Sequence, residues 1–217
     1  MLVNTGKIKI DFPDVEGMIF GKGYKAVCGV DEAGRGPLAG PVVAAAVILP
    51  ENFDLDGLDD SKKCSPELRE EIFQAVIELG VPCGIGIIDN KVIDQINILK
   101  ASLMAMRKAV MDLGQQPDFV LVDGNQMIPK LSYPQMSVIG GDSRCKAISA
   151  ASIMAKVTRD RIMMKYDELY PAFSFAQHKG YGTEQHLAEL KQHGPCDIHR
   201  RSFRPVAELL EKQYAFF

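Results

Sequence analysis

Residues 27–41 read V-C-G-V-D-E-A-G-R-G-P-L-A-G-P, and the rest of the chain is organised around them. An apolar run leads into two adjacent acids, Asp31 and Glu32, and glycines flank the arginine that follows, Arg35. A second apolar run, at 42–49, comes next and is bounded by prolines. This order predicts a strand, an acidic corner, a glycine loop and a second strand.

The acids and the glycine loop together suit a metal ion beside a phosphate. Paired carboxylates suit a hard cation such as Mg²⁺, and the planar guanidinium of Arg35 suits a phosphate. Because strand side chains alternate between faces, Asp31 and Glu32 are expected to share one site only if the strand ends or bulges there. A tight turn with two solvated acids is the plainer alternative, but the position of the acids after a buried strand favours the metal.

Several other kinds of site find no support in the sequence. The glycine loop precedes an apolar strand rather than a helix, so it is not a dinucleotide-binding fingerprint. The G-K-[ST] phosphate loop and the G-x-S-x-G nucleophile elbow are both absent. A small-molecule α/β enzyme is therefore a weak alternative.

Length, composition and cysteine usage limit the class of protein. The 217 residues are enough for one large domain, or for one domain with an appendage. No apolar run approaches the ~20 residues that span a bilayer, and the N-terminus lacks a signal-peptide core, so we expect a cytoplasmic protein without a membrane partner. Scattered cysteines without a C-x-x-C pair favour reduced, mostly buried thiols: Cys28, Cys64, Cys83, Cys145 and Cys196.

Charge is distributed unevenly along the chain. The net charge of −3 argues by itself against a nucleic-acid partner. From Arg144 to the end, however, 12 Lys and Arg face 8 Asp and Glu, whereas the first 143 residues hold 13 against 20. An acidic part with candidate metal ligands joined to a basic part is compatible with a metal-dependent enzyme acting on a polyanion.

Periodicity and helix caps predict an α/β chain with a mixed sheet. Residues 1–25 read as an irregular lead-in, and 173–183 as a loop. Apolar runs predict strands at 26–30, 42–49, 83–88, 119–123 and 135–139. Amphipathic stretches predict helices at 65–79, 90–113 with a break near Asn97, 144–170, 184–193 and 205–214.

Acids follow three of the predicted strands: Asp31 with Glu32, then Asp123, then Asp142. Ligands of open α/β sheets collect beyond the carboxyl ends of neighbouring parallel strands, so four carboxylates converge if these strands are neighbours. Four unpaired carboxylates would repel one another and raise each other's pKa. A pair of divalent cations would remove the repulsion and would suit phosphodiester hydrolysis.

These motifs resemble those of ribonuclease HII, the prokaryotic type 2 ribonuclease H. The resemblance covers about residues 27–204 and includes D-D-S-K-K, L-V-D-G-N, G-D-S, I-S-A-A-S-I-M-A-K-V-T-R-D, F-A-Q-H-K-G-Y-G-T and R-R-S-F. The related ribonuclease HIII carries an extra N-terminal domain, whereas only about 25 residues precede the first predicted strand here. The glycine–arginine–glycine loop is also of the HII type.

The resemblance implies an α/β, ribonuclease H-like fold. It implies a mixed five-stranded sheet flanked by helices, with a C-terminal helical segment. We accordingly divide the chain into a lead-in (1–25), a catalytic core (26–170), and a C-terminal loop with helices that contribute to substrate binding (171–217). A monomer is expected.

The resemblance also implies an activity. The enzyme would hydrolyse the RNA strand of RNA–DNA hybrids and would cut 5′ to ribonucleotides embedded in duplex DNA. Two-metal-ion hydrolysis with Mg²⁺ or Mn²⁺ would leave 5′-phosphate and 3′-hydroxyl ends. The catalytic and metal-binding acids would be Asp31, Glu32, Asp123 and Asp142.

Further residues would bind the substrate. The 2′-hydroxyl distinguishes RNA from DNA, and the resemblance assigns its recognition to Gly34, Arg35, Gly36 and Tyr181. Contacts to backbone phosphates and polar support would come from Lys62, Lys63, Lys156, Asn125, Ser149 and Ser152. A packed loop anchor at the tyrosine, solvated lysines and helix-packing serines are the alternatives. His178 and His199 are taken as structural, because two-metal hydrolysis needs no dedicated base.

The last five residues, Gln213–Phe217, resemble the peptides that bind sliding clamps. Two terminal aromatic rings need a pocket, which either a clamp or the chain's own core would supply. Two alternatives to the main interpretation also remain. One is another two-metal nuclease or nucleotidyl transferase of the same fold, and the other is a non-catalytic module that binds hybrids or a clamp. A non-catalytic module would be expected to lack one of the four acids.

Overall fold

The computed structural model describes residues 15–50 and 64–214, with side chains up to residue 211. Five strands form one mixed sheet in the order β3-β2-β1-β4-β5. The pairs β1–β2 and β2–β3 are antiparallel, and β1–β4 and β4–β5 are parallel. The strands are β1 (Val27–Ala33), β2 (Val42–Ile48), β3 (Cys83–Ile88), β4 (Phe119–Asp123) and β5 (Gln135–Val138).

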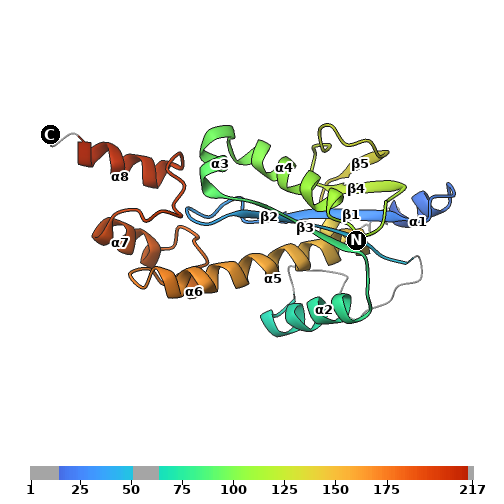
Figure 1. The fold of residues 1–217 in the computed structure, drawn as a ribbon, viewed down its shortest axis with the longest axis horizontal. Coiled ribbons are helices and arrows are strands. Elements are labelled where there is room, and N and C mark those ends of the chain that lie inside the picture. The colour runs from blue at the N-terminus through green and yellow to red at the C-terminus, as the bar shows by residue number, and fades with distance from the viewer. Residues whose placement is uncertain (1–14, 51–63, 215–217) are drawn as a thin grey trace, which may run out of the picture.

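Helices cover both faces of the sheet (Figure 1). One face carries α3 and α4, and the other carries α5 and α2, while α6, α7 and α8 gather at one end, on the left of the figure. The helices are α1 (Val15–Phe20), α2 (Pro66–Glu78), α3 (Asn90–Ile96), α4 (Ile98–Met111), the 3₁₀ turn η1 (Gly141–Ser143), α5 (Lys146–Leu169), α6 (Phe175–His178), α7 (Glu184–His193) and α8 (Arg204–Tyr214). The predicted α/β architecture with a mixed five-stranded sheet is confirmed.

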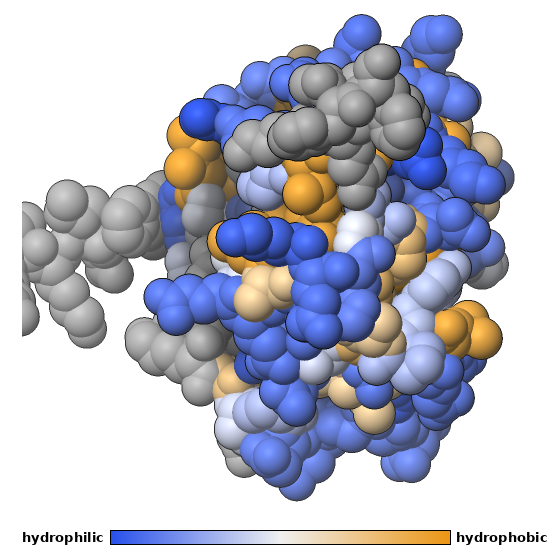
Figure 2. All heavy atoms as spheres, turned by 90° about the vertical axis from the view of Figure 1, so that its left-hand side faces the viewer, coloured by the Kyte–Doolittle hydropathy of each residue, from blue (hydrophilic) through white to orange (hydrophobic). Residues whose placement is uncertain are grey.

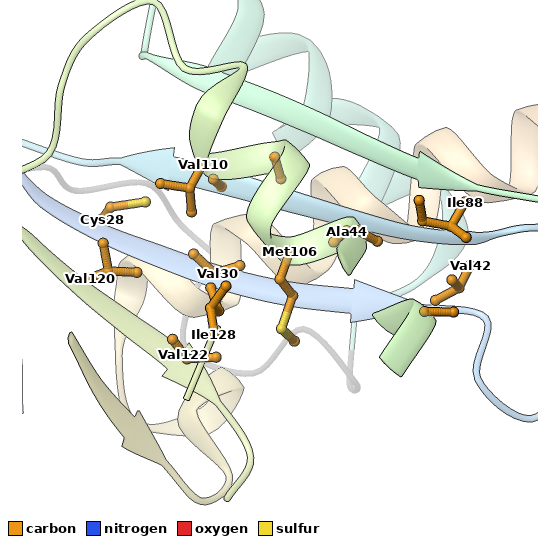
Figure 3. Close-up of a cluster of buried hydrophobic side chains, with 14 of the residues drawn as sticks. Cys28, Val30, Val42, Ala44, Ile88, Met106, Val110, Val120, Val122 and Ile128 are labelled. Carbon is orange, nitrogen blue, oxygen red and sulfur yellow. The ribbon is translucent and has the colours of Figure 1, made fainter. Parts of the chain in front are cut away.

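Strand alternation divides the core between the two faces of the sheet. On β2, Ala44 and Ala46 pack in the cluster beneath α4, whereas Ala45 and Val47 pack in the cluster beneath α5 and α2. Figure 3 shows the first cluster, in which Met106 of α4 lies over the central strands. Because β2 is buried on both faces, its sequence is a continuous apolar run rather than an alternating pattern.

Helix α5 lies unusually close to β1. A Cβ atom built on Gly29 would stand 2.2 Å from the carbonyl carbon of Ala147 and 2.3 Å from the backbone nitrogen of Ile148. The small residues at the start of α5 permit this approach, as their composition predicts. The close packing holds α5 beside the part of β1 that carries the first two acids.

The prediction of an irregular N-terminal lead-in is wrong for residues 15–20, which form α1. Val15 and Ile19 lie four residues apart, so the helix α1 buries both in one apolar cluster. The Glu16 carboxylate accepts hydrogen bonds at 2.7 and 2.8 Å from the backbone N–H groups of Lys146 and Ala147. These contacts at the start of α5 are tertiary, which explains why the local sequence pattern did not reveal the helix.

Other predicted boundaries hold with small corrections. The break near Asn97 is confirmed, since this residue separates α3 from α4 with φ at 68°. The loop prediction for 173–183 missed the short helix α6, and the prediction for the first strand stopped three residues early. None of the helices in the described ranges has the length and apolarity to cross a membrane.

Candidate active site

The structure confirms that the three acid-bearing strands are parallel neighbours. Asp31 and Asp123 each follow the last paired position of β1 with β4, which joins Val30 to Val122. Asp142 is buried in the turn η1, directly after β5. The carboxyl ends of β1, β4 and β5 therefore bring all four predicted acids to one edge of the sheet.

The expectation that β1 ends or bulges at its acids is wrong. The register between β1 and β2 continues without interruption through Asp31↔Ala45 and Glu32↔Ala44. Only the pairing of β1 with β4 ends before the acids. The charge of Asp123 nevertheless raises the pKa of both acids, so both lie within electrostatic range of that carboxylate.

Burial and mutual repulsion make these carboxylates costly to ionise. Asp31 is only 6% exposed, and its burial raises its pKa well above the usual value, with further increases from the charges of Glu32 and Asp123. A hydrogen bond from Ser152 opposes the rise. Burial also raises the pKa of Glu32, against the lowering effect of Arg35, whose Nη1 lies 3.2 Å from Glu32 Oε1.

The chemistry of these donors suits a divalent cation. Positive charge would offset the burial and repulsion that raise the pKa values of Asp31 and Glu32. Asp123 is held in place, since its Oδ1 accepts a hydrogen bond of 2.7 Å from Gly141. Across the ranges that the structure describes, no three His, Cys, Asp or Glu side chains are arranged as ligands of one metal ion. Metal binding by the four acids therefore stays a prediction.

The glycine loop after β1 lies against the predicted tyrosine. Gly34 adopts a φ of +99°, and a Cβ at this position would stand 2.2 Å from Nε of Arg159. At Gly36 a Cβ would lie 3.8 Å from the Tyr181 ring. The ring is in the neighbourhood of the loop but 43% of the residue is exposed, which disfavours the alternative of a packed loop anchor.

Two buried arginines hold this loop, and the sequence interpretation assigned no role to either. Arg159 of α5 donates to the carbonyl oxygens of Pro41, Lys179 and Ala39 at 3.0 to 3.1 Å. Arg200 donates to those of Gly34, Arg35, Gly40 and Pro41 at 2.6 to 3.2 Å. Both residues are fully buried. The one sequence signal that could have indicated a buried Arg159 is its position within an otherwise apolar stripe of the predicted helix.

The substitution Arg159→Lys tests this arrangement. Lysine lacks the planar fork of donors, so it could not replace all three hydrogen bonds that Arg159 donates to the carbonyl oxygens of Pro41, Lys179 and Ala39. We expect the free energy of unfolding to fall by about 2–4 kcal/mol, measured by urea denaturation. The matched control is Arg161→Lys, also on α5, which alters an exposed ion pair with Glu70 of α2 and should cost less than about 1 kcal/mol. Equal losses in the two variants would contradict the assignment.

The remaining predicted site residues differ in their surroundings. Lys156 pairs with Asp160 at 2.8 Å and places its Nζ 5.9 Å from the centre of the Tyr181 ring. Ser152 contacts Asp31, as already described. The Ser149 hydroxyl is buried without a hydrogen-bond partner, and Asn125 is exposed just beyond β4. Lys62 and Lys63 lie outside the described residues.

Hydrophilic side chains cover most of the end of the molecule on which α6, α7 and α8 lie (Figure 2). Helix α8 runs to Tyr214, so the proposed clamp-binding peptide begins inside it. The side chains of Gln213 and Tyr214, and all of residues 215–217, lie outside the described part of the chain. The structure therefore leaves the prediction for this tail untested.

The mixed five-stranded sheet, with helices on both faces, places the chain in the ribonuclease H-like class of folds. The family model for ribonuclease HII matches residues 28–206. A ribonuclease HII from Geobacter sulfurreducens is 53% identical over 197 residues, which cover 91% of this chain and 90% of that protein. The chain belongs to the ribonuclease HII family.

Solved structures agree with this assignment. The ribonuclease H2 of Pyrococcus horikoshii is 27% identical with a TM-score of 0.69, over 86% of this chain and 97% of that one. The ribonuclease HII of Archaeoglobus fulgidus, solved in complex with PCNA, shares the fold at 24% identity and a TM-score of 0.64, over 82% of this chain and 95% of that one. The protein is thus a metal-dependent endoribonuclease that hydrolyses the RNA of RNA–DNA hybrids.

Proposed function

We propose that this enzyme cuts on the 5′ side of ribonucleotides, both in hybrid runs and as single units embedded in duplex DNA. Products would carry 5′-phosphate and 3′-hydroxyl ends. One observation carries the proposal: Asp31 and Glu32 lead directly into the loop whose Gly36 lies beside the exposed Tyr181 ring. A group that cleaves a phosphodiester and a group that senses the adjacent sugar would then share one surface.

The four acids Asp31, Glu32, Asp123 and Asp142 would hold the catalytic cations, Mg²⁺ or Mn²⁺. Such cations lower the pKa of an attacking water and stabilise the charge that develops on the leaving oxygen. The chain's own contribution is to hold the carboxylates in place. Two hydrogen bonds supply this support, one from Ser152 to Asp31 and one from the backbone of Gly141 to Asp123.

The sugar would be recognised by Gly34, Arg35, Gly36 and Tyr181. The carbonyl oxygen of Gly34 already accepts a hydrogen bond from Arg200, and Arg35 and Gly36 are the exposed members of the loop. Backbone groups of the loop would bind the 2′-hydroxyl. The Tyr181 ring would stack on the next sugar, where a 2′-hydroxyl would crowd it, and this would favour an RNA–DNA junction.

The segment 171–217 would contribute to substrate binding, since it carries Tyr181. Lys156, whose Nζ lies 5.9 Å from the centre of that ring, would bind a phosphate. The other proposed phosphate and polar contacts are Lys62, Lys63, Asn125, Ser149 and Ser152. We place the enzyme in the cytoplasm as a monomer that acts in DNA replication and repair. The A. fulgidus complex with PCNA supports a clamp partner for Gln213–Phe217.

The junction proposal predicts a selective effect of Tyr181→Ala. Loss of a stacking ring costs roughly 1–3 kcal/mol, so cleavage at a lone ribonucleotide should slow about 10-fold more than cleavage of an all-RNA strand in a hybrid. The matched control is Tyr181→Phe, which keeps the ring and should keep the preference. The measurement is kcat/KM on labelled duplexes, with an all-DNA duplex alongside.

Other outcomes would favour the alternatives. Cleavage of the all-DNA duplex would indicate a nuclease that ignores the 2′-hydroxyl. Failure of folded, metal-supplied protein to cut any hybrid would indicate a binding module. An equal slowing on both substrates by Tyr181→Ala would remove the junction assignment while leaving the ribonuclease activity intact.

A further inference from the structure

A short C-terminal segment, residues 196–200, lies beside the glycine loop. His199 forms an isolated antiparallel bridge with Ala39. The backbone N–H of Arg200 donates to Leu38 at 2.8 Å. The segment therefore follows the loop that leads away from the first two acids, although 160 residues separate them in the chain.

The imidazole of His199 begins a chain of hydrogen bonds that ends at Tyr181. The backbone N–H of Cys196 donates to Nδ1 of His199 at 3.0 Å, so the neutral ring carries its proton on Nε2. That nitrogen lies 3.0 Å from Nε2 of His186, which must accept. Nδ1 of His186 then donates to the carbonyl oxygen of Tyr181 at 2.9 Å. Because each of these two rings accepts a hydrogen bond on one nitrogen, both His199 and His186 are neutral. We call this chain of hydrogen bonds from His199 through His186 to Tyr181 the histidine relay.

The surroundings of this histidine relay favour the neutral over the protonated form of His186 and His199. His186 and His199 are buried, and the His186 ring stacks on that of His178 with centroids 4.2 Å apart. Phe175 packs edge-on against His186 at 5.6 Å. Burial lowers the pKa of His199 to about 4, and burial also lowers that of His186, with further lowering by the nearby imidazoles.

The charged and titratable groups around the relay fit the same assignment. Gly180 donates its N–H to Nδ1 of His178 at 3.1 Å, so the Nε2–H of that ring faces the carboxylate of Glu189 at 3.0 Å. The thiol of Cys196, whose pKa burial raises to about 11, lies 3.1 Å from His199. The carboxylate thus pairs with His178 and leaves the relay between His199 and Tyr181 uncharged.

We propose that His199 and His186 are positioning residues for ribonucleotide recognition. They hold the backbone of Tyr181, while the next residue, Arg200, holds the carbonyl oxygens of the glycine loop. Two adjacent residues of one segment therefore set the distance between the tyrosine and Gly36. This inference rests on the proposed role of Tyr181 at the junction.

The test measures a selectivity ratio, defined as kcat/KM for a single embedded ribonucleotide divided by kcat/KM for an all-RNA strand in a hybrid. His186→Phe keeps a ring for packing but removes the donor to Tyr181, so the ratio should fall about 10-fold or more. His186→Asn places an amide N–H near the position of Nδ1 and should restore most of the ratio. The matched control, His193→Phe, changes an exposed histidine of the same helix outside the relay and should leave the ratio unchanged.

The ratio separates positioning from folding. A loss of folded enzyme lowers both rates equally and cancels in the ratio. If His186→Phe gave the same ratio as His193→Phe, the positioning role would be overturned. The same would follow if His186→Asn were no better than His186→Phe. Tyr181→Ala in parallel distinguishes the two proposals, because an unchanged ratio in that variant would overturn the role of Tyr181 itself.

The wild-type enzyme supplies an independent readout. Burial lowers the pKa of His199 to about 4, below the ordinary histidine value near 6.5, and it also lowers the pKa of His186, whose Nε2 accepts a hydrogen bond from His199. The selectivity ratio should therefore stay constant between pH 8 and about pH 6. A ratio that fell with a midpoint near the ordinary histidine value would overturn the neutral relay.

Discussion

Asp31→Asn is expected to reduce cleavage of an RNA–DNA hybrid by about 10³-fold or more, the scale on which single electrostatic contacts to a reacting group act. The same substitution should stabilise the protein in EDTA. Burial and the charges of Glu32 and Asp123 raise the pKa of Asp31, so its ionised form weakens the folded state at neutral pH. The neutral amide removes that cost and still accepts the hydrogen bond from the backbone of Glu32.

The sign of this effect gives a pH test. A carboxyl whose pKa is raised on folding binds its proton more tightly in the folded state, so wild-type stability increases as the pH falls through the raised pKa towards the lower pKa of the unfolded chain. Asp31→Asn should lack this increase at position 31. Thermal unfolding of both proteins in EDTA, repeated at several pH values, measures this difference. Each kcal/mol of added stability should raise the Tm by about 2–4 °C.

Metal addition separates the two consequences of Asp31→Asn. Mg²⁺ or Mn²⁺ should raise the Tm of the wild type. At a free metal concentration of 100 times Kd, the free energy of unfolding should increase by about 2.7 kcal/mol. The Tm of the variant should rise far less. Glu71→Gln, which neutralises an exposed acid on α2, serves as the control and should retain both activity and the metal response. An Asp31→Asn protein that kept full activity, or the full metal response, would contradict the assignment of this acid.

Gly29→Ala is expected to destabilise the fold by about 3 kcal/mol or more. The added Cβ would stand 2.2 Å from the carbonyl carbon of Ala147 and 2.5 Å from its oxygen. These are backbone atoms of α5 and cannot rotate away, so the helix must move from β1. Because α5 carries the Ser152 partner of Asp31, a shift of about 1 Å should also lower activity by up to ~10²-fold in protein that remains folded.

The control for this substitution is Gly114→Ala. A Cβ on Gly114 would meet no atom within 4 Å, so stability should change by less than about 0.5 kcal/mol. Urea denaturation of both variants gives the comparison, and activity is measured below the unfolding transition. Near-equal stabilities for Gly29→Ala and Gly114→Ala would show that α5 moves without cost, contrary to the close packing described.

Local patterns predicted most of the secondary structure because each element carries its own signal. Ser65 accepts the N–H of Leu68 at 3.2 Å and begins α2, as its position before Pro66 indicates. The positive φ of Asn97 marks the break between α3 and α4. The boundaries that were missed depend on partners elsewhere in the chain. Helix α1 is one example, since it packs against strands and α5 more than a hundred residues away.

The features of the candidate site also divide into those visible in the local sequence and those that depend on distant parts of the chain. Acids next to apolar runs were visible in the sequence, and their convergence needed only the expectation that three strands were parallel neighbours. The continuation of β1 through both acids was not visible, because it depends on pairing with β2. The buried arginines were missed for a similar reason: an arginine satisfied by carbonyl oxygens cannot be distinguished from a solvated one by its neighbours in sequence.

The sequence by itself determined the strands, most helices and the family of the protein, and it predicted the four acids as metal ligands. These features follow from hydrophobic periodicity, helix caps and motifs whose signals span few residues. Only the tertiary structure decided how closely α5 approaches Gly29 and how Arg200 hydrogen-bonds to the carbonyl oxygens of the glycine loop. It also decided how His199 reaches Tyr181 through His186. Each of these contacts joins groups far apart in the chain, and their free energy depends on burial and on hydrogen bonds that form only once the chain has folded.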